Sequence, residues 1–218
     1  MAAPRTSTPA GAAATNSADA ILDAGEELFA AQGYDAVTIK QIAAKASVNV
    51  ALIYYYHDSK ETLYRHIIER FVSALVSKAS AHLLAATNPE DAIRAVTQAQ
   101  FELLSAKPYL PRLIVRELVD YQASHAAPVL QQLGANVFHR LVGAIRDGQE
   151  RGVFRRDLDA RFAAFSTIAQ LPYFFVARPA LGALALGEGT HADAATAAAF
   201  ARHAGNFAVA ALRTPQSS

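Results

Sequence analysis

Residues 38–63 read TIKQIAAKASVNVALIYYYHDSKETL, and they carry the strongest structural signal in the chain. Thr38 suits the N-cap of a first short helix, because a threonine oxygen can accept a bond from the exposed backbone N–H groups. The turn-forming residues 47–49 interrupt this helix, and Asn49 can cap a second one over about residues 50–56. Two short helices joined by a tight turn predict a helix-turn-helix unit.

One further helix is predicted before this unit and a long one after it. Apolar residues recur at helical spacing over residues 17–32 and end at Gly33, which suits the left-handed position that closes a helix. Asp58 with Glu61 three positions later is the carboxylate form of a capping box, so a helix should open there and run to about Ala86. Residues 1–16 lack a hydrophobic segment and are expected to be a disordered tail.

The remainder of the chain also has helical patterning. Asn88 and Pro89 mark a helix start, and Pro179 is expected to stop a later helix. We expect helices over residues 89–106, around 113–118, and over 129–152, 159–177 and 191–213. The pattern predicts an all-α fold of nine helices. Its N-terminal three-helix domain covers residues 17–63, and the following six-helix domain covers residues 64–218.

Composition narrows the class of protein. Hydrophobic residues make up 52% of the chain and charged residues 18%, as in folded globular proteins, and many of the hydrophobic residues are helix-favouring alanines. There is no cysteine, which excludes disulfides and thiolate metal sites. No apolar run reaches the roughly 18 residues needed to cross a bilayer. A cytoplasmic protein is therefore expected.

The net charge is not typical of a nucleic-acid-binding protein. The net charge is +1, and from Ser17 to Arg70 eight acidic residues outnumber five basic ones. Only the stretch 38–60 has a basic excess, with three lysines and one aspartate. Any basic surface for DNA is therefore small and local.

Residues 39–63 nevertheless closely resemble the DNA-binding domain of the TetR family of repressors, and the resemblance extends over about residues 18–70. It is carried by the apolar pair Ile42-Ala43, Val48 in the turn, the run Ile53-Tyr54-Tyr55-Tyr56, and the run from Asp58 to Tyr64. The resemblance implies a homodimeric transcriptional repressor that binds a palindromic double-stranded DNA operator and is released by a small molecule. The long helix from Asp58 would link the DNA to the core.

The second short helix would be the recognition helix. Its start must carry short or polar side chains, because larger ones would hold the backbone away from the base edges. Asn49, Val50 and Ala51 meet that need, and the resemblance implies that they face the major groove together with Tyr55. Asn49 is either a base-contacting residue or only an N-cap.

Other residues are candidates for the phosphate backbone. Thr38 lies at a helix N-terminus, where a hydroxyl and backbone N–H groups can face the same anion. Lys60 lies in the first turn of the long helix, where a cation opposes the helix dipole unless an anion is present. The resemblance also implies that Lys40 reaches a phosphate or a base and that the Tyr54 hydroxyl contacts the backbone.

Two positions depart from the family pattern. Ser47 replaces the glycine usual in the turn, which is strained if this position needs a positive φ. His57 replaces the usual phenylalanine and is either a core residue or a group whose protonation loosens the domain.

The resemblance also implies that residues 64–218 enclose a ligand pocket and form the dimer. The dimer would use the last two helices, where alanines permit close approach, although a purely intramolecular bundle is the alternative. Candidate pocket residues, each of which can instead be ordinary core, are Phe101, Tyr109, Phe138, Gln170, Tyr173 and Phe174. Alanines proposed for the dimer contact are Ala194, Ala195, Ala197, Ala198 and Ala201.

No catalytic constellation is found. The seven histidines show no His-Glu-x-x-His spacing, and there is no glycine-rich phosphate loop, so neither an enzyme nor a cofactor or metal site is expected. Arg112, Arg116 and Glu117 are interpreted as a solvated face, with a charged contribution to the ligand pocket as the alternative. The alternative function is a helical small-molecule-binding or interaction protein whose DNA binding is weak or lost.

Overall fold

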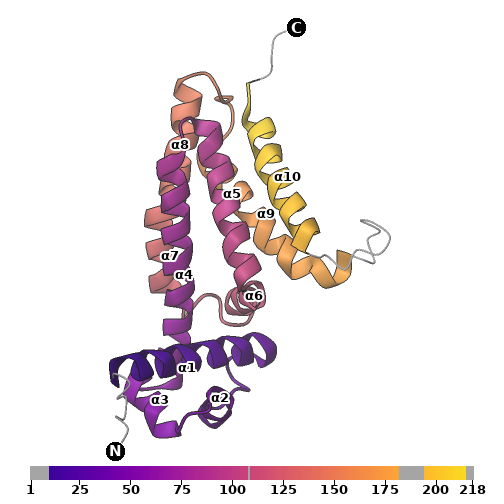
Figure 1. Cartoon of the computed structure of the whole chain (residues 1–218). Coiled ribbons are helices and arrows are strands. Elements are labelled where there is room, and N and C mark those ends of the chain that lie inside the picture. The colour runs from indigo at the N-terminus through magenta and orange to yellow at the C-terminus, as the bar shows by residue number, and fades with distance from the viewer. Residues whose placement is uncertain (1–9, 108, 182–193, 215–218) are drawn as a thin grey trace, which may run out of the picture.

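The computed structural model describes residues 10–107, 109–181 and 194–214, and within them the protein is almost entirely helical (Figure 1). The only strand-like feature in these ranges is an isolated bridge between Phe154 and Arg213. None of the described helices is long and apolar enough to cross a membrane. The elements are α1 (Ala10–Gln32), α2 (Ile39–Ala46), α3 (Val50–His57), α4 (Lys60–Ala85), α5 (Pro89–Ala106), α6 (Leu110–Asp120), α7 (Ala127–Leu133), a π-helical turn (Gly134–Phe138), α8 (His139–Glu150), α9 (Ala160–Leu181) and α10 (Ala194–Leu212).

The helices form two parts joined by α4. Helices α1, α2 and α3 lie together at one end, and α4 rises from them into a bundle with α5, α7 and α8 (Figure 1). Helix α10 packs along α5 on the other side of the bundle. The helix-turn-helix core contains the fully buried side chains of Phe29, Ile42, Ile53 and Leu63. The tertiary position of the helix-turn-helix is therefore fixed by apolar burial against α1 and α4.

Two predicted helix starts were wrong. Helix α1 begins at Ala10, so residues 10–16 are not the tail that was expected; residues 1–9 lie outside the described residues. Four of these seven residues are alanine, the strongest helix former, which explains the extension. The N-cap of α4 is Ser59, not Asp58: its Oγ accepts a hydrogen bond from Thr62 N at 3.0 Å. Asp58 has a φ of 49° and instead ends α3, donating its N–H to Tyr54 O.

The C-terminal helices also differ from the prediction. The helix expected over residues 129–152 is divided by the π-helical turn into α7 and α8, which makes ten α-helices in the described residues rather than nine. Helix α9 runs to Leu181, so Pro179 does not stop it. A proline in the last turn removes only one helical hydrogen bond, and the chain continues past it. The proposed start of the last helix, Thr190 to Asp193, lies outside the described residues.

Candidate nucleic-acid interface

Helix α2 begins with a complete capping box. Thr38 Oγ1 accepts a hydrogen bond from Gln41 N at 3.3 Å, and Thr38 N donates to Gln41 Oε1 at 2.7 Å. The Thr38 hydroxyl also donates to Gln41 Oε1 at 2.9 Å. The start of α2 is therefore fixed locally, and Thr38 remains exposed at the surface where a phosphate contact was predicted.

The turn between α2 and α3 requires a left-handed residue. Ser47 has φ 56° and ψ 39°, and its N–H donates to Ala44 O while Val48 N donates to Ala43 O. This closure satisfies carbonyls at the end of α2. The position does need a positive φ, which was the condition stated for strain at Ser47, so a side chain stands where the backbone favours glycine.

Helix α3 presents an exposed face. Asn49 Oδ1 accepts a hydrogen bond from Leu52 N at 2.7 Å, so Asn49 is the N-cap of α3, and its side chain lies at the surface. Ala51 is also exposed, Tyr55 is 78% exposed and Tyr54 is 49% exposed. Val50 is half-buried against the core. The recognition-helix residues thus share an accessible surface, held in place from behind by buried Ile53.

The two lysines proposed for phosphate contact differ in their surroundings. Lys40 is exposed, and no ion pair engages it among the described residues. Lys60 is half-buried, with its Nζ 4.3 Å from the centroid of the Tyr34 ring and 3.3 Å from Asp35 O. These two interactions within the chain stabilise the Lys60 cation at the start of α4, so a bound phosphate is not needed to explain its position.

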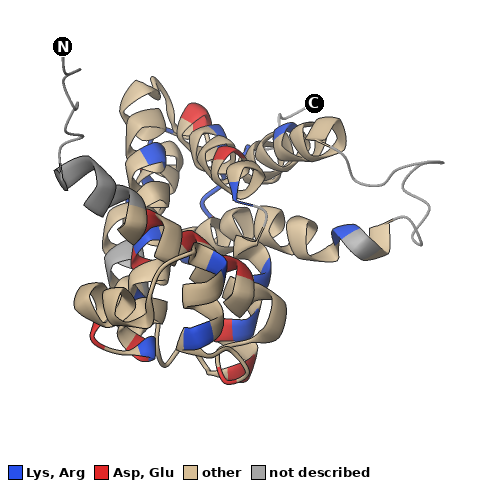
Figure 2. Ribbon diagram, turned by 60° about the horizontal axis from the view of Figure 1, so that its bottom comes forward, with Lys and Arg blue, Asp and Glu red and all other residues tan. Residues whose placement is uncertain are grey.

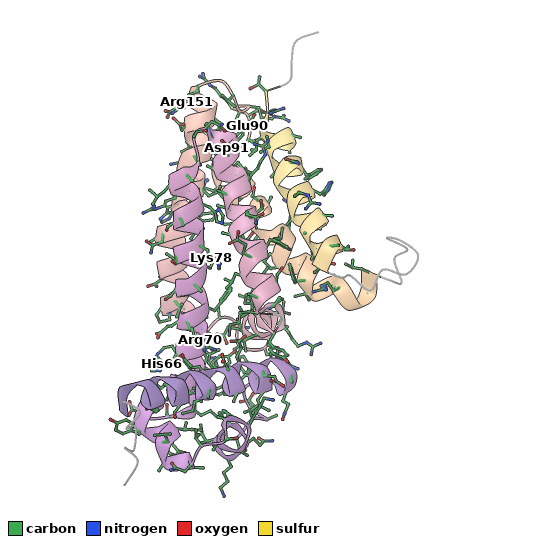
Figure 3. The ribbon with its side chains drawn as sticks, viewed as in Figure 1. His66, Arg70, Lys78, Glu90, Asp91 and Arg151 are labelled. Carbon is green, nitrogen blue, oxygen red and sulfur yellow. The ribbon has the colours of Figure 1, made fainter. Side chains whose placement is uncertain are left out.

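Two of the eight acidic residues of this segment are engaged away from α3. Asp23 and Glu26 of α1 form ion pairs with Arg70 of α4 and Lys107, at 2.8 to 3.4 Å. Figure 3 shows Arg70 where α4 passes α1, and Figure 2 shows basic and acidic segments intermingled at this end. These carboxylates attach the helix-turn-helix to the bundle, and their charge is compensated there.

His57 is a core residue, as one of the two predictions for it stated. It is 5% exposed, and its Nδ1 lies 2.8 Å from Nδ1 of His66 on α4. Burial and the neighbouring His66 lower the pKa of His57 from 6.5 to about 4. Its Nε2 is buried with no hydrogen-bond partner. The imidazole is consequently neutral at ordinary pH.

The second part of the protein contains an apolar cavity of about 160 Å³. Fifteen residues line it, from α4, α5, α6, α9 and the segment before α7, and all but Gln100 and Glu117 are apolar or aromatic. Glu117 is buried, which corrects its interpretation as part of a solvated face. Its carboxylate accepts hydrogen bonds from Tyr64 Oη at 3.0 Å, from the backbone N and the Nδ1 of His125, and from Ala126 N.

None of the six candidate pocket residues lines this cavity. Phe101 and Phe138 are half-buried and pack against the core, and Phe174 is buried with its ring stacked on Phe200 at 4.2 Å. Tyr109 is 42% exposed and Tyr173 is 75% exposed, and Gln170 lines a separate groove between α9 and α10. Choosing aromatic residues therefore missed the cavity, which is built mainly from leucines and isoleucines.

Helix α9 carries an exposed aromatic stripe. Phe162, Phe165 and Tyr173 are 73%, 66% and 75% exposed, and they follow one another at helical spacing on one face. Phe207 of α10 is 58% exposed. Ala197 and Ala201, two of the alanines proposed for the dimer, are instead buried within the chain's own core.

These features define a helix-turn-helix regulatory protein with a helical second domain. Residues 21–67 match the family model of bacterial regulatory proteins of the tetR family, and residues 89–205 match the tetracyclin repressor-like C-terminal domain. The chain belongs to the TetR family of DNA-binding transcriptional regulators.

Proteins that match most of the length of this chain are also regulatory proteins. The transcriptional repressor NicS of Pseudomonas putida is 31% identical over 160 residues, which cover 72% of this chain and 74% of NicS. Among solved structures, the fatty acid degradation regulator FadR from Bacillus halodurans matches with a TM-score of 0.70 at 22% identity, over 89% of this chain and 99% of FadR. The regulator PfmR from Thermus thermophilus matches with a TM-score of 0.69 at 19% identity, with the same coverage. The two structures support the fold.

Proposed function

We propose that this protein is a ligand-responsive transcriptional repressor that binds a palindromic operator as a homodimer in the cytoplasm. Residues 17–63 would form the DNA-binding domain, and residues 64–218 the domain for ligand binding and dimerisation. The observation that carries the proposal is the accessibility of α3, a capped helix on which Asn49, Ala51 and Tyr55 are all exposed. The major groove accommodates a helix with such short and polar residues at its start.

The residues would divide into two groups. Asn49, Val50, Ala51 and Tyr55 would contact base edges, with the Asn49 amide suited to adenine and the methyl groups suited to thymine. The phosphate contacts would come from Thr38, Lys40, Tyr54 and Lys60. Lys60 would have to leave Asp35 O or reach past it, whereas Lys40 is available without rearrangement.

The dimer would form through α9 and α10. The aromatic stripe on α9 is an exposed apolar surface of a kind that is rare in soluble monomers. Packing it against a second copy of the chain would remove that surface from water. A two-fold pairing would place two α3 helices for successive major grooves, roughly 34 Å apart. Replacing Phe165 with Glu should give a monomer in analytical ultracentrifugation and abolish the two-fold footprint. The matched control Leu84→Glu changes an even more exposed leucine of α4 and should remain dimeric.

Footprinting and salt-dependent binding on the DNA upstream of the protein's own gene would test operator binding. Lys40→Ala should weaken binding to all sequences and reduce the slope of log K against log salt by about one unit. Lys78→Ala removes the same charge from α4 far above the helix-turn-helix (Figure 3) and should leave the slope unchanged.

Base reading is tested by Asn49→Ser, because serine keeps the N-cap but lacks the amide. This change should alter which operator sequence is preferred, by about 1–3 kcal/mol at one base pair. The alternative function, a helical binding protein with weak or lost DNA affinity, is motivated by the eight acidic residues over 17–70. Binding that is weak, salt-insensitive and indifferent to both Lys40→Ala and Asn49→Ser would favour that alternative.

A further inference from the structure

The cavity between α4, α5, α6 and α9 has one unusual polar feature, and it originates in a proline. Pro172 lies within α9 four residues after Ile168, and proline has no backbone N–H. The Ile168 carbonyl therefore lacks its usual helical donor. Gln100 of α5 replaces that donor, because its Nε2 donates to Ile168 O at 3.0 Å. Gln100, Ile168 and Pro172 all line the cavity.

This contact fixes the orientation of the Gln100 amide. A carbonyl oxygen can only accept, so the nitrogen of the amide has to face Ile168 and the oxygen has to face the other way. Gln100 is 4% exposed, and its Oε1 is buried without a hydrogen-bond partner. A buried acceptor left unsatisfied costs free energy, which a ligand with a donor at this point would recover.

The remaining lining defines the rest of the ligand. Thirteen of the fifteen lining residues are apolar or aromatic, and none of the fifteen is a lysine, arginine or histidine. The other polar residue, Glu117, already accepts bonds from Tyr64, His125 and Ala126. An anion would thus enter beside a carboxylate without a compensating cation, and a cation would lose its hydration for a carboxylate that is already satisfied. A cavity of about 160 Å³ is close in size to the engineered apolar cavity of about 150 Å³ that binds benzene.

We propose that this cavity binds an uncharged, mainly apolar small molecule, about the size of one substituted ring, whose hydroxyl or N–H group donates a hydrogen bond to Gln100 Oε1. Gln100 is then a specificity-determining residue, and Pro172 positions its amide by freeing the carbonyl that holds it. The inference rests on the proposed ligand-responsive function, because this molecule would be the effector.

The test uses phenol and toluene, which have nearly the same shape but differ in the hydrogen-bond donor. Their affinities for the full-length, DNA-free protein would be measured by isothermal titration calorimetry. In Gln100→Leu the ratio of phenol affinity to toluene affinity should fall at least about tenfold, because only phenol loses a bond. Comparing the ratio cancels the difference in hydrophobicity between the two probes.

Two further variants protect the result against misfolding. Gln100→Leu leaves the Ile168 carbonyl without a donor, whereas Pro172→Ala restores a backbone N–H to it. The double variant Gln100→Leu/Pro172→Ala is therefore expected to fold and to show the same loss of phenol preference. Pro172→Ala alone retains the acceptor, but its new backbone N–H competes with Gln100 for the Ile168 carbonyl. The phenol preference should therefore weaken in this variant and still stay above that of Gln100→Leu. Gln98→Leu makes the identical change on the exposed face of α5 and should leave the ratio unchanged.

Benzoate and benzylamine test the requirement for an uncharged ligand, and both should bind more weakly than phenol. A ratio that does not respond to the loss of Gln100, or a charged probe that binds more tightly than phenol, would overturn the inference. Operator release by phenol is scored separately. If phenol binds with the expected dependence on Gln100 but leaves DNA binding unchanged, the cavity assignment stands and the ligand-responsive function fails.

Discussion

Replacing His57 with phenylalanine should remove a loss of stability that the protein suffers in mild acid. The folded-state pKa of His57 is about 4, below the 6.5 of an exposed histidine, mainly because the ring is buried and secondly because His66 lies beside it. The neutral tautomer with its hydrogen on Nδ1 can donate to His66 and leaves a bare lone pair on Nε2. Protonation would add a buried N–H there with no acceptor.

The sign of the effect follows from this depressed pKa. Above pH 6.5 both the folded and unfolded states hold His57 neutral, and its contribution is fully present. As the pH falls from 6.5 toward 4, the unfolded chain takes up a proton that the folded state resists, and stability is lost. Proton linkage over the range from about pH 7.5 to about pH 5 gives a loss of about 2 kcal/mol in the free energy of unfolding.

Urea unfolding of the wild type and His57→Phe at the two pH values would measure this contribution. The difference in free energy of unfolding between the two pH values should be about 2 kcal/mol smaller in His57→Phe than in the wild type. His203→Gln changes an exposed histidine of α10 and should behave like the wild type. Equal pH dependence in all three proteins would refute the reasoning, because titration of His57 would then contribute nothing.

Two other substitutions test the turn and the link between the domains. Ser47→Gly should raise the free energy of unfolding by about 0.5–1 kcal/mol, since relief at φ 56° exceeds the added freedom of the unfolded chain; Ser47→Ala, measured in the same urea titration, should give no such gain. Tyr64→Phe should lower the free energy of unfolding by about 1–3 kcal/mol, because it removes a buried donor from Glu117. The control Tyr121→Phe loses only an exposed bond to Asp35. Equal losses of stability for the two variants in thermal unfolding would contradict this prediction.

The helix-turn-helix could be predicted because its signals are local. Thr38 and Asn49 cap their helices within three residues of themselves, and the strain at Ser47 depends only on its own backbone angles. The start of α4 was misplaced by one residue because Asp58 and Ser59 are both good caps, and the sequence alone does not show which one adopts the extended conformation. Local chemistry thus predicts the element but leaves a choice between neighbouring residues.

The cavity could not be predicted because its polar residues act through long-range contacts. Gln100 is held by a carbonyl 68 positions away, and nothing near it in the sequence distinguishes it from the exposed Gln98. Glu117 lies on an amphipathic helix among charged residues, and its burial depends on Tyr64, 53 positions earlier, as well as on His125 and Ala126 in the segment after α6. One local signal was available: Pro172 inside a predicted helix implies a freed carbonyl at Ile168, and a freed carbonyl in a core requires a donor from elsewhere.

The same buried contacts join the cavity to the DNA-binding end. Glu117 lines the cavity and accepts from Tyr64, whose hydroxyl keeps its proton because burial and the carboxylate raise its pKa far above the usual value. The Tyr64 ring packs edge-on against Phe29 of α1 and against Tyr34, over which Lys60 lies. A ligand that moved α6 would therefore disturb this cluster, against which the helix-turn-helix packs through Phe29 of α1. If the proposed function holds, such coupling is reciprocal, and operator DNA that holds α1 and α4 in one position would change the affinity of the cavity by the same factor.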